Sequence, residues 1–375
     1  MQSSKAIVIG AGIVGVATAR ALSLKGYAVT VIERTDKAVG ASIRNFGMLW
    51  PIGQAAGKLY QRALRSKEIW KEVADSTGLP YLENGSLHTA YHADEWQVLQ
   101  ELEAEFLKEN RHVSLMNKNE MQQKFSGLQS EGLLGGLFSA TEMIVDPREA
   151  IATAAAYLEE FLGVQFIWGK QVNEVTSHSV RSGKEIYKAD IVCICNGADF
   201  ETLFPEIFNE LPITKCKLQM LRFVSDQPAF TIGTSVCGGL SLIHYKSFTA
   251  APSLPKLKQR YEMEMAEYLN AGIHVMVSQN NRGELTVGDS HEYAKTFEPF
   301  DSAHINQLIL DYLQTFMHSK QWQLTQTWNG VYPKMTNGET DLFLQPEPGV
   351  YIVNGLGGAG MTLSFGFAEE VVSSL

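Results

Sequence analysis

The residues best suited to chemistry lie near the start of this 375-residue chain, in the run Gly10–Gly15 with the sequence GAGIVG. In a loop with this spacing the first glycine permits a tight turn, the second lets a pyrophosphate approach the backbone, and the third lets a helix pack against a strand. The first N–H groups of that helix attract phosphate. Glu33, 18 residues after Gly15, is placed to accept hydrogen bonds from a ribose diol. The pattern predicts a dinucleotide site and disfavours NADP, whose 2′-phosphate the acid would repel.

The elements around this loop make the motif specific. Residues 5–9 are a short β-branched run that predicts a strand, residues 16–24 have helical spacing, and residues 28–32 predict a second strand. A glycine-rich turn in another kind of α/β protein is the alternative interpretation. The complete order of strand, glycine loop, helix, strand and acid favours a Rossmann-like domain built on a parallel sheet.

Three later segments favour FAD over NAD. Residues 40–51 are rich in small and amide side chains and have no clear period, so they could lay backbone N–H groups along a flat ring; an ordinary surface loop is the alternative. Residues 189–198 predict a buried strand of a parallel sheet, ending in a small-residue turn. Residues 349–354 predict another strand, and the glycine-rich run 355–362 then opens a helix over 363–372. Such a run offers a second anion site, which a flavin ring needs when it gains negative charge on reduction.

With these segments in place, the sequence resembles the FAD-dependent amino-acid and amine oxidases typified by D-amino-acid, glycine and sarcosine oxidases. The resemblance covers essentially the whole chain. It depends on GAGIVG with Glu33 and on the segments GASIRNFG, ADIVCICNGA, WNGVYP and NGLGGAGMTLSFG. Within the family the chain looks closest to a branch found with phosphonate-breakdown genes, through RNFGMLWPIGQ, GIHVMVSQNNRGELTVGDSHEY and WNGVYPKM.

The resemblance implies a role for each matching segment. The first glycine loop and Glu33 would hold the ADP half, and residues 357–362 would face the pyrimidine edge of the flavin. Val172, on a strand expected over residues 170–175, would contact the adenine through its backbone. Sarcosine oxidases tether their flavin to a cysteine close to the C-terminal region, whereas no cysteine follows Cys237 here, so we expect noncovalent FAD. The residues expected at the cofactor are Gly10, Gly12, Ile13, Val14, Gly15, Glu33, Arg34, Ser42, Asn45, Phe46, Gly47, Val172, Asn196, Gly197, Gly330, Gly357, Gly358, Ala359, Gly360, Met361 and Thr362.

The segments assigned to the cofactor are interrupted twice, which predicts two discontinuous domains. We expect an FAD-binding α/β domain from residues 1–80, 145–212 and 325–375, and a substrate domain from residues 81–144 and 213–324. In the second domain, strand-like runs occur at 81–90, where an Asn-Gly turn interrupts them, at 213–224, and at 273–279 and 284–288 around a hairpin turn. Residues 94–110 and 301–318 have helical spacing. This mixture predicts an α+β fold, and in the family such an antiparallel sheet roofs the flavin.

One departure from the family concerns the substrate. Amino-acid oxidases of this family usually have an arginine where Tyr332 stands, and that arginine clamps the substrate carboxylate through two hydrogen bonds, which a tyrosine cannot imitate. A tyrosine hydroxyl with nearby cations could instead hold a phosphonate. The residues expected at the substrate are Arg44, Met48, Trp50, His244, His274, His291, Tyr332 and Lys334.

Simpler interpretations stand beside these assignments. Lys334 could be solvated, Arg44 could pair with Glu33 or another acid, and His274 and Trp50 could belong to the core. His244, His274 and His291 could bind zinc, but no HxH or HxxxH spacing occurs among them, so we expect no metal ion.

The expected reaction is amine oxidation by hydride transfer to flavin N5, followed by hydrolysis of the imine to an aldehyde with release of amine or ammonia. Dioxygen would reoxidise the flavin to give hydrogen peroxide. No catalytic side chain is required beyond the flavin, since the cofactor carries the chemistry. The expected substrate is a small anionic amine, 2-aminoethylphosphonate or an N-methyl derivative. Oxidation of glycine, sarcosine or a D-amino acid, electron transfer to an acceptor other than oxygen, and a non-catalytic FAD sensor are the alternatives.

Composition excludes several other classes of protein. A net charge of −10 argues against a nucleic-acid partner, because phosphate backbones need clustered Lys and Arg. The four cysteines form no CxxC pair, which is typical of buried thiols in a reducing compartment. No apolar run reaches the length of a membrane span. We therefore expect a cytoplasmic protein without a membrane partner, and the sequence leaves its oligomeric state open.

Overall fold

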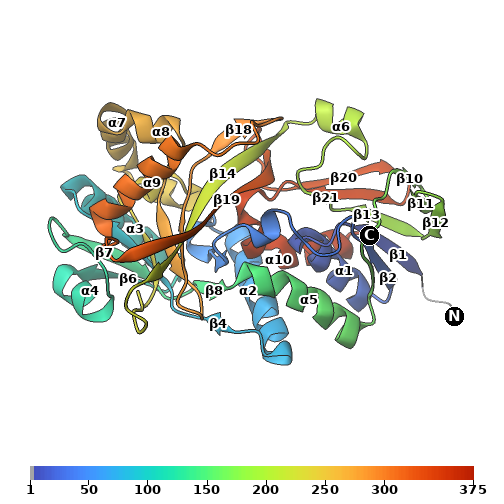
Figure 1. The fold of residues 1–375 in the computed structure, drawn as a ribbon, viewed down its shortest axis with the longest axis horizontal. Coiled ribbons are helices and arrows are strands. Elements are labelled where there is room, and N and C mark those ends of the chain that lie inside the picture. The colour runs from blue at the N-terminus through green and yellow to red at the C-terminus, as the bar shows by residue number, and fades with distance from the viewer. Residues whose placement is uncertain (1–3) are drawn as a thin grey trace.

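The computed structural model describes residues 4–375, and its first layer is a six-stranded sheet. Along the sheet the strands are β20 (Leu342–Glu347), β21 (Val350–Asn354), β13 (Ile191–Ile194), β1 (Lys5–Ile9), β2 (Ala28–Ile32) and β9 (Gln165–Ile167). All neighbours are parallel except β20 and β21. Strands from the beginning, middle and end of the chain therefore lie side by side (Figure 1).

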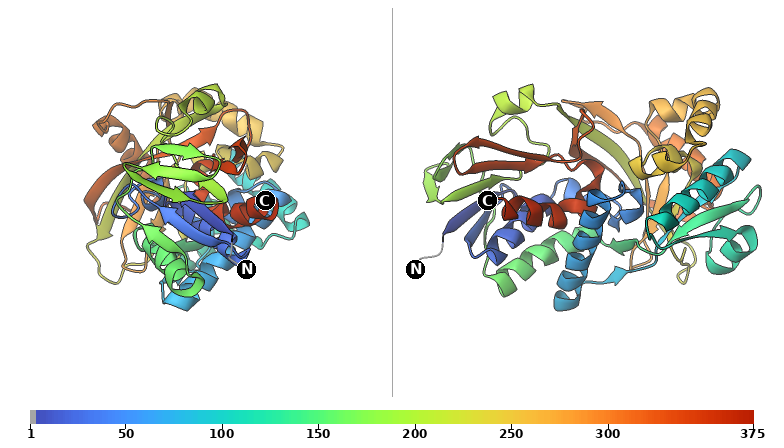
Figure 2. Two further views of the ribbon diagram at one scale, coloured as in Figure 1. Left: turned by 90° about the vertical axis from the view of Figure 1, so that its right-hand side faces the viewer. Right: turned by 180° about the vertical axis from the view of Figure 1, so that it is seen from behind.

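Both faces of this sheet are covered, which explains why its strands are apolar on both sides. In β1, Ala6 and Val8 pack into one core cluster, whereas Ile7 and Ile9 pack into another. Four helices cover the first face: α1 (Ile13–Leu24), α2 (Lys58–Thr77), α5 (Pro147–Leu162) and α10 (Gly360–Ser373) (Figure 2). The other face packs against α6 (Pro205–Glu210) and a three-stranded sheet of β10 (Glu174–Thr176), β11 (Ser179–Ser182) and β12 (Glu185–Lys188).

The second layer is a larger, mainly antiparallel sheet. Its order is β18 (Glu292–Ala294), β14 (Ile213–Ser225), β17 (Leu285–Gly288), β16 (Met276–Gln279), β15 (Ser235–Cys237), β5 (Ser86–Ala90), β7 (Gly135–Ser139) and β6 (Val113–Asn117), and β19 (Trp322–Met335) also pairs with β14. Only β15 and β5 pair in parallel among these strands of residues 4–375. Helices α3 (Ala93–Lys108), α4 (Lys118–Lys124), α7 (Leu254–Glu264), α8 (Ala266–Asn270) and α9 (Ala303–Phe316) surround it at the left of Figure 1.

Short elements join the two layers. A small sheet contains β3 (Met48–Leu49), β8 (Met143–Val145) and β4 (Tyr81–Leu82). Five 3-10 turns complete the described chain: η1 (Ala41–Ile43), η2 (Pro51–Gly53), η3 (Gly239–Ile243), η4 (Lys246–Ala250) and η5 (Gly357–Ala359). The result is the predicted combination of a parallel α/β layer and an antiparallel α+β layer. The predicted domain boundary at residue 325 falls inside β19, and the domain limits stay a prediction.

Three local predictions were wrong. Residues 81–90 do not form a hairpin, because β4 pairs with β8 while β5 pairs with β7 and β15. The strand expected over 170–175 is limited to Glu174–Thr176, so Val172 lies in a connection. His274 is not in mid-strand, since β16 begins at Met276. In each case local β propensity did not specify the tertiary partner that a strand requires.

The described residues contain no helix that is long and apolar enough to cross a membrane. All four cysteines are unpaired thiols in the interior.

Candidate active site

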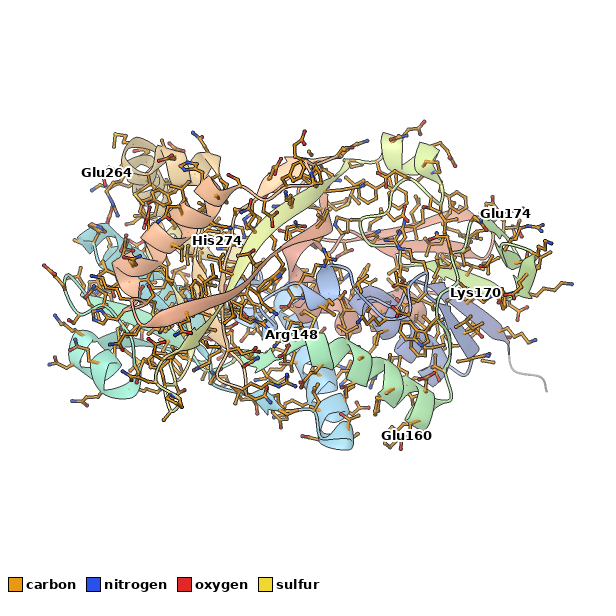
Figure 3. The ribbon with its side chains drawn as sticks, viewed as in Figure 1. Arg148, Glu160, Lys170, Glu174, Glu264 and His274 are labelled. Atoms are coloured by element: carbon orange, nitrogen blue, oxygen red, sulfur yellow. The ribbon has the colours of Figure 1, made fainter. Side chains whose placement is uncertain are left out.

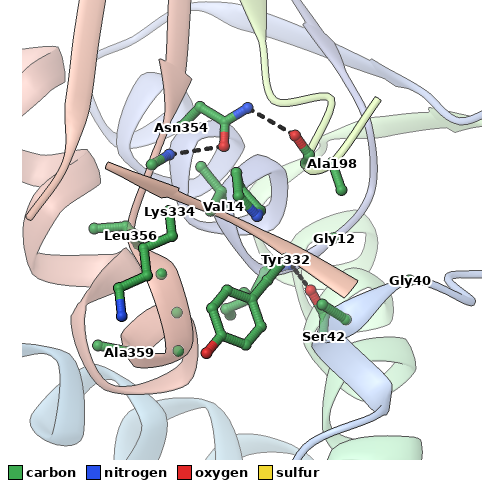
Figure 4. Close-up of a pocket in the computed structure, with 18 of the residues that line it drawn as sticks. Gly12, Val14, Gly40, Ser42, Ala198, Tyr332, Lys334, Asn354, Leu356 and Ala359 are labelled. Carbon is green, nitrogen blue, oxygen red and sulfur yellow. Dashed lines mark hydrogen bonds between the residues drawn. The ribbon is translucent and has the colours of Figure 1, made fainter. Parts of the chain in front are cut away.

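A cavity of about 1090 Å³ lies between the two layers, and segments that are far apart in the sequence line it. Its volume is at the upper end of ordinary ligand pockets, which suits a ligand the size of a dinucleotide. All the residues predicted for cofactor and substrate line this cavity, except Gly15 and Gly47. Figure 4 shows part of the lining, with Gly12, Ser42 and the β19 residues Tyr332 and Lys334 around one space.

The first glycine loop has little room for side chains. Gly10 has a φ of +103°, and a Cβ there would lie 2.5 Å from the carbonyl oxygen of Cys195. A Cβ on Gly12 would approach Ser42 Oγ to 3.1 Å on the cavity side. Gly15 is outside the cavity because its function is packing: a Cβ there would overlap the carbonyl oxygen of Gly10 and push α1 off the strand. The loop therefore keeps a bare backbone beside the cavity.

Polar side chains hold this loop in position. Glu33, at the end of β2, accepts a hydrogen bond from Ala11 N at 2.8 Å, and its other oxygen accepts from the backbone and hydroxyl of Thr35. Ser42 Oγ accepts from Ile13 N at 2.9 Å in the first turn of α1. No acidic side chain stands in that first turn. The helix therefore directs its positive end toward the cavity without a protein carboxylate there to compete with a phosphate.

The loop over 40–47 is held together by its own amide side chain. Asn45 Nδ2 donates to the carbonyl oxygens of Ala41 and Ser42, and Asn45 Oδ1 accepts from Gly47 N at 2.8 Å. Gly47 has a φ of +74°, and a Cβ there would overlap the carbonyl oxygen of Val145. Gly47 therefore shapes the loop from outside the cavity, whereas Asn45 and Phe46 line it.

Asn354 joins two of the returning segments. It lies at the end of β21, is buried, and donates through Nδ2 to Asn196 Oδ1 and to the carbonyl oxygen of Gly197. Its Oδ1 accepts from Gly355 N, where the C-terminal glycine-rich run begins. Figure 4 shows Asn354 beside the turn that contains Ala198. We did not predict this residue, although an amide between an apolar strand and a glycine run is a detectable signal.

The C-terminal glycine run meets the larger sheet at Tyr332. A Cβ on Gly358 would lie 3.4 Å from the Tyr332 hydroxyl, so the tyrosine stands directly over the loop that opens α10. Trp50 N donates to Thr362 Oγ1 at 2.9 Å, which fastens the 40–51 segment to the first turn of that helix. Trp50 packs in the hydrophobic core of the larger sheet and also lines the cavity.

Two basic side chains reach the same region. Lys334 is half-buried and donates to the Tyr293 hydroxyl at 2.9 Å, so it is not simply solvated. Burial lowers its pKa from the ordinary lysine value. Arg44 donates to the carbonyl oxygen of Asn329 at 3.3 Å, and within residues 4–375 it forms no ion pair with Glu33.

Three histidines and a carboxylate gather at the far end of the cavity. The ring centroids of His244 and His274 are 3.6 Å apart, and the ring of His291 lies 5.0 and 4.9 Å from them. Asp289 Oδ1 lies 3.2 Å from His274 Nε2. Figure 3 places His274 within the antiparallel layer, away from the parallel sheet. Asp289 was missed by the sequence reasoning, although it stands only two residues before His291.

Burial determines the charge of this group. It lowers the pKa of His274 well below the ordinary histidine value and that of His291 to about 4, and the nearby Lys334 adds to the effect. The same burial raises the pKa of Asp289 well above the ordinary range. His244, in contrast, is exposed. The two buried imidazoles are therefore neutral near pH 7 and do not supply the positive charge expected for a bound anion.

Comparison with known proteins identifies this architecture. The family model of the DAO family, described as FAD dependent oxidoreductase, matches residues 5–374. The chain belongs to this family. A glycine oxidase from Pseudomonas aeruginosa is 24% identical over 244 residues, which cover 59% of this chain and 63% of that protein, so the match spans less than two thirds of the relative.

Solved structures of the DAO family have the same fold. A glycine oxidase from Bacillus cereus superposes with a TM-score of 0.79 at 17% identity, covering 99% of this chain and 94% of the other. An L-proline dehydrogenase from P. horikoshii gives a TM-score of 0.78 at 21% identity, covering 99% and 92%. The family, described as FAD dependent oxidoreductase, binds FAD.

The residues present fit FAD. The bare backbone at Gly12, where a Cβ would fill the space next to Ser42, suits a pyrophosphate, and Glu33 lies at the ribose position of the motif. Elsewhere in the cavity wall, Trp50 Nε1 is buried and has no hydrogen-bond partner among residues 4–375. This N–H group is therefore available to donate a hydrogen bond to a bound ligand. Further lining residues that we did not predict are Gln54, Tyr245, Met276, Asp289 and Asn354.

Proposed function

We propose that this DAO-family protein oxidises a small aminophosphonate, 2-aminoethylphosphonate or an N-methyl derivative, and uses dioxygen as the electron acceptor. The observation that carries the proposal is Tyr332, which stands over the Gly358 loop at the position where the sequence resemblance implies an arginine in amino-acid oxidases. Because a tyrosine cannot grip a carboxylate with two parallel hydrogen bonds, the end of the cavity beside Tyr332 suits a different anion.

The chain's own residues contribute positioning. Lys334 Nζ, bonded to the Tyr293 hydroxyl, is a cation on the strand that carries Tyr332, and both side chains line the cavity. A phosphonate bound beside Tyr332 and Lys334 would direct the amine-bearing carbon of the substrate toward the flavin region, which Asn45, Phe46 and Gly358 line. Trp50 and Met48 add an apolar wall that excludes water from this region.

Bound FAD supplies the two-electron acceptor for the hydride that leaves the carbon beside the amine nitrogen. The imine formed from the substrate takes up water and yields an aldehyde with released amine or ammonia, and dioxygen becomes hydrogen peroxide. The cavity geometry does not require an acid–base side chain when the amine binds in its neutral form. Alignment by the residues named above is therefore the main contribution of the protein.

The test is anaerobic reduction of the flavin by a panel of amines, followed by admission of air. We expect 2-aminoethylphosphonate or its N-methyl derivative to bleach the visible flavin band faster than glycine, sarcosine or D-alanine. Recovery of the band with release of peroxide would identify an oxidase, and slow recovery would identify a dehydrogenase. Rapid turnover of glycine with none of the phosphonates would contradict the proposal, as would a flavin that no amine bleaches.

A further inference from the structure

The three histidines at the far end of the cavity come from three separate segments. His244 follows η3, His274 lies between α8 and β16, and His291 lies between β17 and β18. Each offers one ring nitrogen to a common centre, and those three nitrogens all lie within 4.8 Å of one another. Folding has therefore built a convergent nitrogen cluster that no short sequence spacing could reveal.

A hydrogen bond orients one of the rings, and a second ring lies close to a carboxylate. The Nδ1 atom of His291 lies 2.9 Å from the carbonyl oxygen of Gly272, which leaves Nε2 free. The Nε2 atom of His274 faces Asp289 Oδ1, which leaves Nδ1 free. In metal sites a ligating histidine commonly directs its second nitrogen at a carboxylate or a backbone carbonyl in this way. In this cluster His274 faces a carboxylate, and His291 faces a backbone carbonyl.

The buried polar atoms of the cluster lack proper partners. Both ring nitrogens of His274 and Oδ1 of Asp289 are buried without a well-aligned hydrogen bond in the described part of the chain. Asp289 is 4% exposed, and within residues 4–375 no lysine or arginine pairs with it. A buried carboxylate without a cation is costly, and such groups are ordinarily paired or bound to metals. The cluster therefore has unpartnered donor atoms for a cation, and a buried carboxyl group whose ionised form a cation would stabilise.

We propose that His244, His274 and His291 bind one divalent transition-metal ion of the zinc class, with Asp289 as the carboxylate behind His274. Imidazole nitrogens suit such ions, and three protein ligands leave a further coordination position open. Nitrogens around a tetrahedral zinc ion are roughly 3.4 Å apart, given bonds of about 2.0–2.1 Å, which is within the 4.8 Å that bounds the separations of the three ring nitrogens here. The same three histidines also line a smaller, largely apolar pocket.

His244, His274 and His291 all line the cavity, so an ion bound to them lies in the cavity wall. On the proposed function, the ion adds positive charge to this wall and binds a phosphonate oxygen through its open position. Metal binding itself does not depend on the identity of the substrate. The binding of the ion and its use as an anchor can therefore be tested separately.

The first test measures zinc in the FAD-loaded protein by elemental analysis and by calorimetric titration after chelator dialysis. We expect one ion per chain. His244→Gln, at the most exposed of the three positions, should weaken zinc binding by at least about 100-fold, and Asp289→Asn by about 10–100-fold. His304→Gln is the matched control, because His304 is an exposed histidine on α9 that pairs with Glu267. The FAD-to-protein ratio reports folding in every variant.

Absence of binding for Zn²⁺, Co²⁺, Mn²⁺ and Fe²⁺ to the wild-type holoprotein would overturn the metal site. Unchanged zinc affinity in an FAD-loaded His244→Gln variant would do the same. The anchoring role predicts that removing the ion raises KM for the aminophosphonate at least about tenfold while kcat for the bound substrate changes little. If zinc binds stoichiometrically but no phosphonate reduces the flavin, the proposed substrate is wrong and the metal site stands.

Discussion

Tyr332 is the single side chain on which the proposed substrate depends. It is 8% exposed, and its hydroxyl stands over the Gly358 loop on the substrate side of the cavity. Tyr332→Arg should raise the ratio of kcat/KM for glycine to that for 2-aminoethylphosphonate by about 10–100-fold, because a charged hydrogen bond to a carboxylate is worth roughly 1.5–3 kcal/mol. Stopped-flow flavin reduction with both substrates measures the ratio. Tyr332→Phe is the control, since it removes the hydroxyl without adding a cation, and an unchanged ratio in the arginine variant would contradict the assignment.

His88 is a buried histidine outside the cavity, and it makes stability dependent on pH. It has no solvent exposure, neither ring nitrogen has a partner among residues 4–375, and Phe248 packs 4.9 Å away between ring centroids. Burial lowers its pKa to about 3. In the unfolded chain a histidine takes up its proton near pH 6.5, so the unfolded state binds more protons between about pH 6.5 and pH 3. Stability that is fully present above pH 6.5 is therefore lost as the pH falls through this window.

His88→Phe should remove this contribution. The free energy of unfolding of the variant should fall less steeply with decreasing pH, by about 1.4 kcal/mol per pH unit between pH 6.5 and 5. Urea unfolding at pH 8, 6.5 and 5 measures the difference, and the pH 8 value shows the packing cost of the substitution. Equal slopes for both proteins would show that His88 is protonated in the folded state.

At the scale of elements, helices α2 and α10 are clamped by arginines whose environments differ sharply. Arg62 has a side chain 2% exposed, and it pairs with Asp341 at 2.6 Å and Glu370 at 2.7 Å while lying over the Phe367 ring. Arg65, one turn further along α2, is 46% exposed and pairs with Glu369. The buried clamp lies directly behind the helix that the C-terminal glycine run opens, so it holds the flavin end of the cavity in place.

The two arginines form a matched pair for substitution. Arg62→Met should cost about 2–4 kcal/mol, because it leaves carboxylates without their buried partner, although partial exposure of those carboxylates keeps the cost below that of a wholly buried pair. Arg65→Met should cost only about 0.2–1 kcal/mol. Thermal unfolding of the FAD-loaded proteins compares them. Equal losses would mean that burial does not determine the strength of this clamp.

At the scale of the whole molecule, the cavity exists only where both layers meet. The four cysteines are all buried thiols, and none follows Cys237, so we predict that FAD is held without a covalent bond. Acid precipitation of the yellow protein should leave a colourless pellet and release all the flavin into solution. A pellet that keeps its colour would contradict the prediction.

Noncovalent binding has a thermodynamic consequence for the whole chain. Because the cavity expected to hold FAD is lined by segments from both ends of the sequence, FAD should bind the folded state alone and raise the unfolding midpoint as its concentration increases. At 100 times its Kd the gain is about 2.7 kcal/mol. Thermal unfolding of the apoprotein across a series of FAD concentrations measures this, and a midpoint independent of FAD would contradict it.

Much of the parallel layer and of the cofactor region followed from local patterns. The loop Gly10–Gly15 predicted its own turn, the close approach of α1 and the role of Glu33, because each requirement is a property of the backbone within a few residues. The hairpin between β16 and β17 followed from its turn in the same way. The β4–β5 hairpin was wrong because the choice of strand partner is made by distant segments.

By itself, the sequence determined the cofactor family, the two types of sheet and most of the residues that line the cavity, since glycine spacing and strand patterns encode these locally. Only the tertiary structure decided that His244, His274 and His291 share one centre beside Asp289, and that Asn354 ties together the returning segments. These groups meet through contacts between residues tens to hundreds of positions apart. The burial of His274 and His291, which sets the charge of these two side chains, is a property of the packed interior that no short stretch of sequence contains.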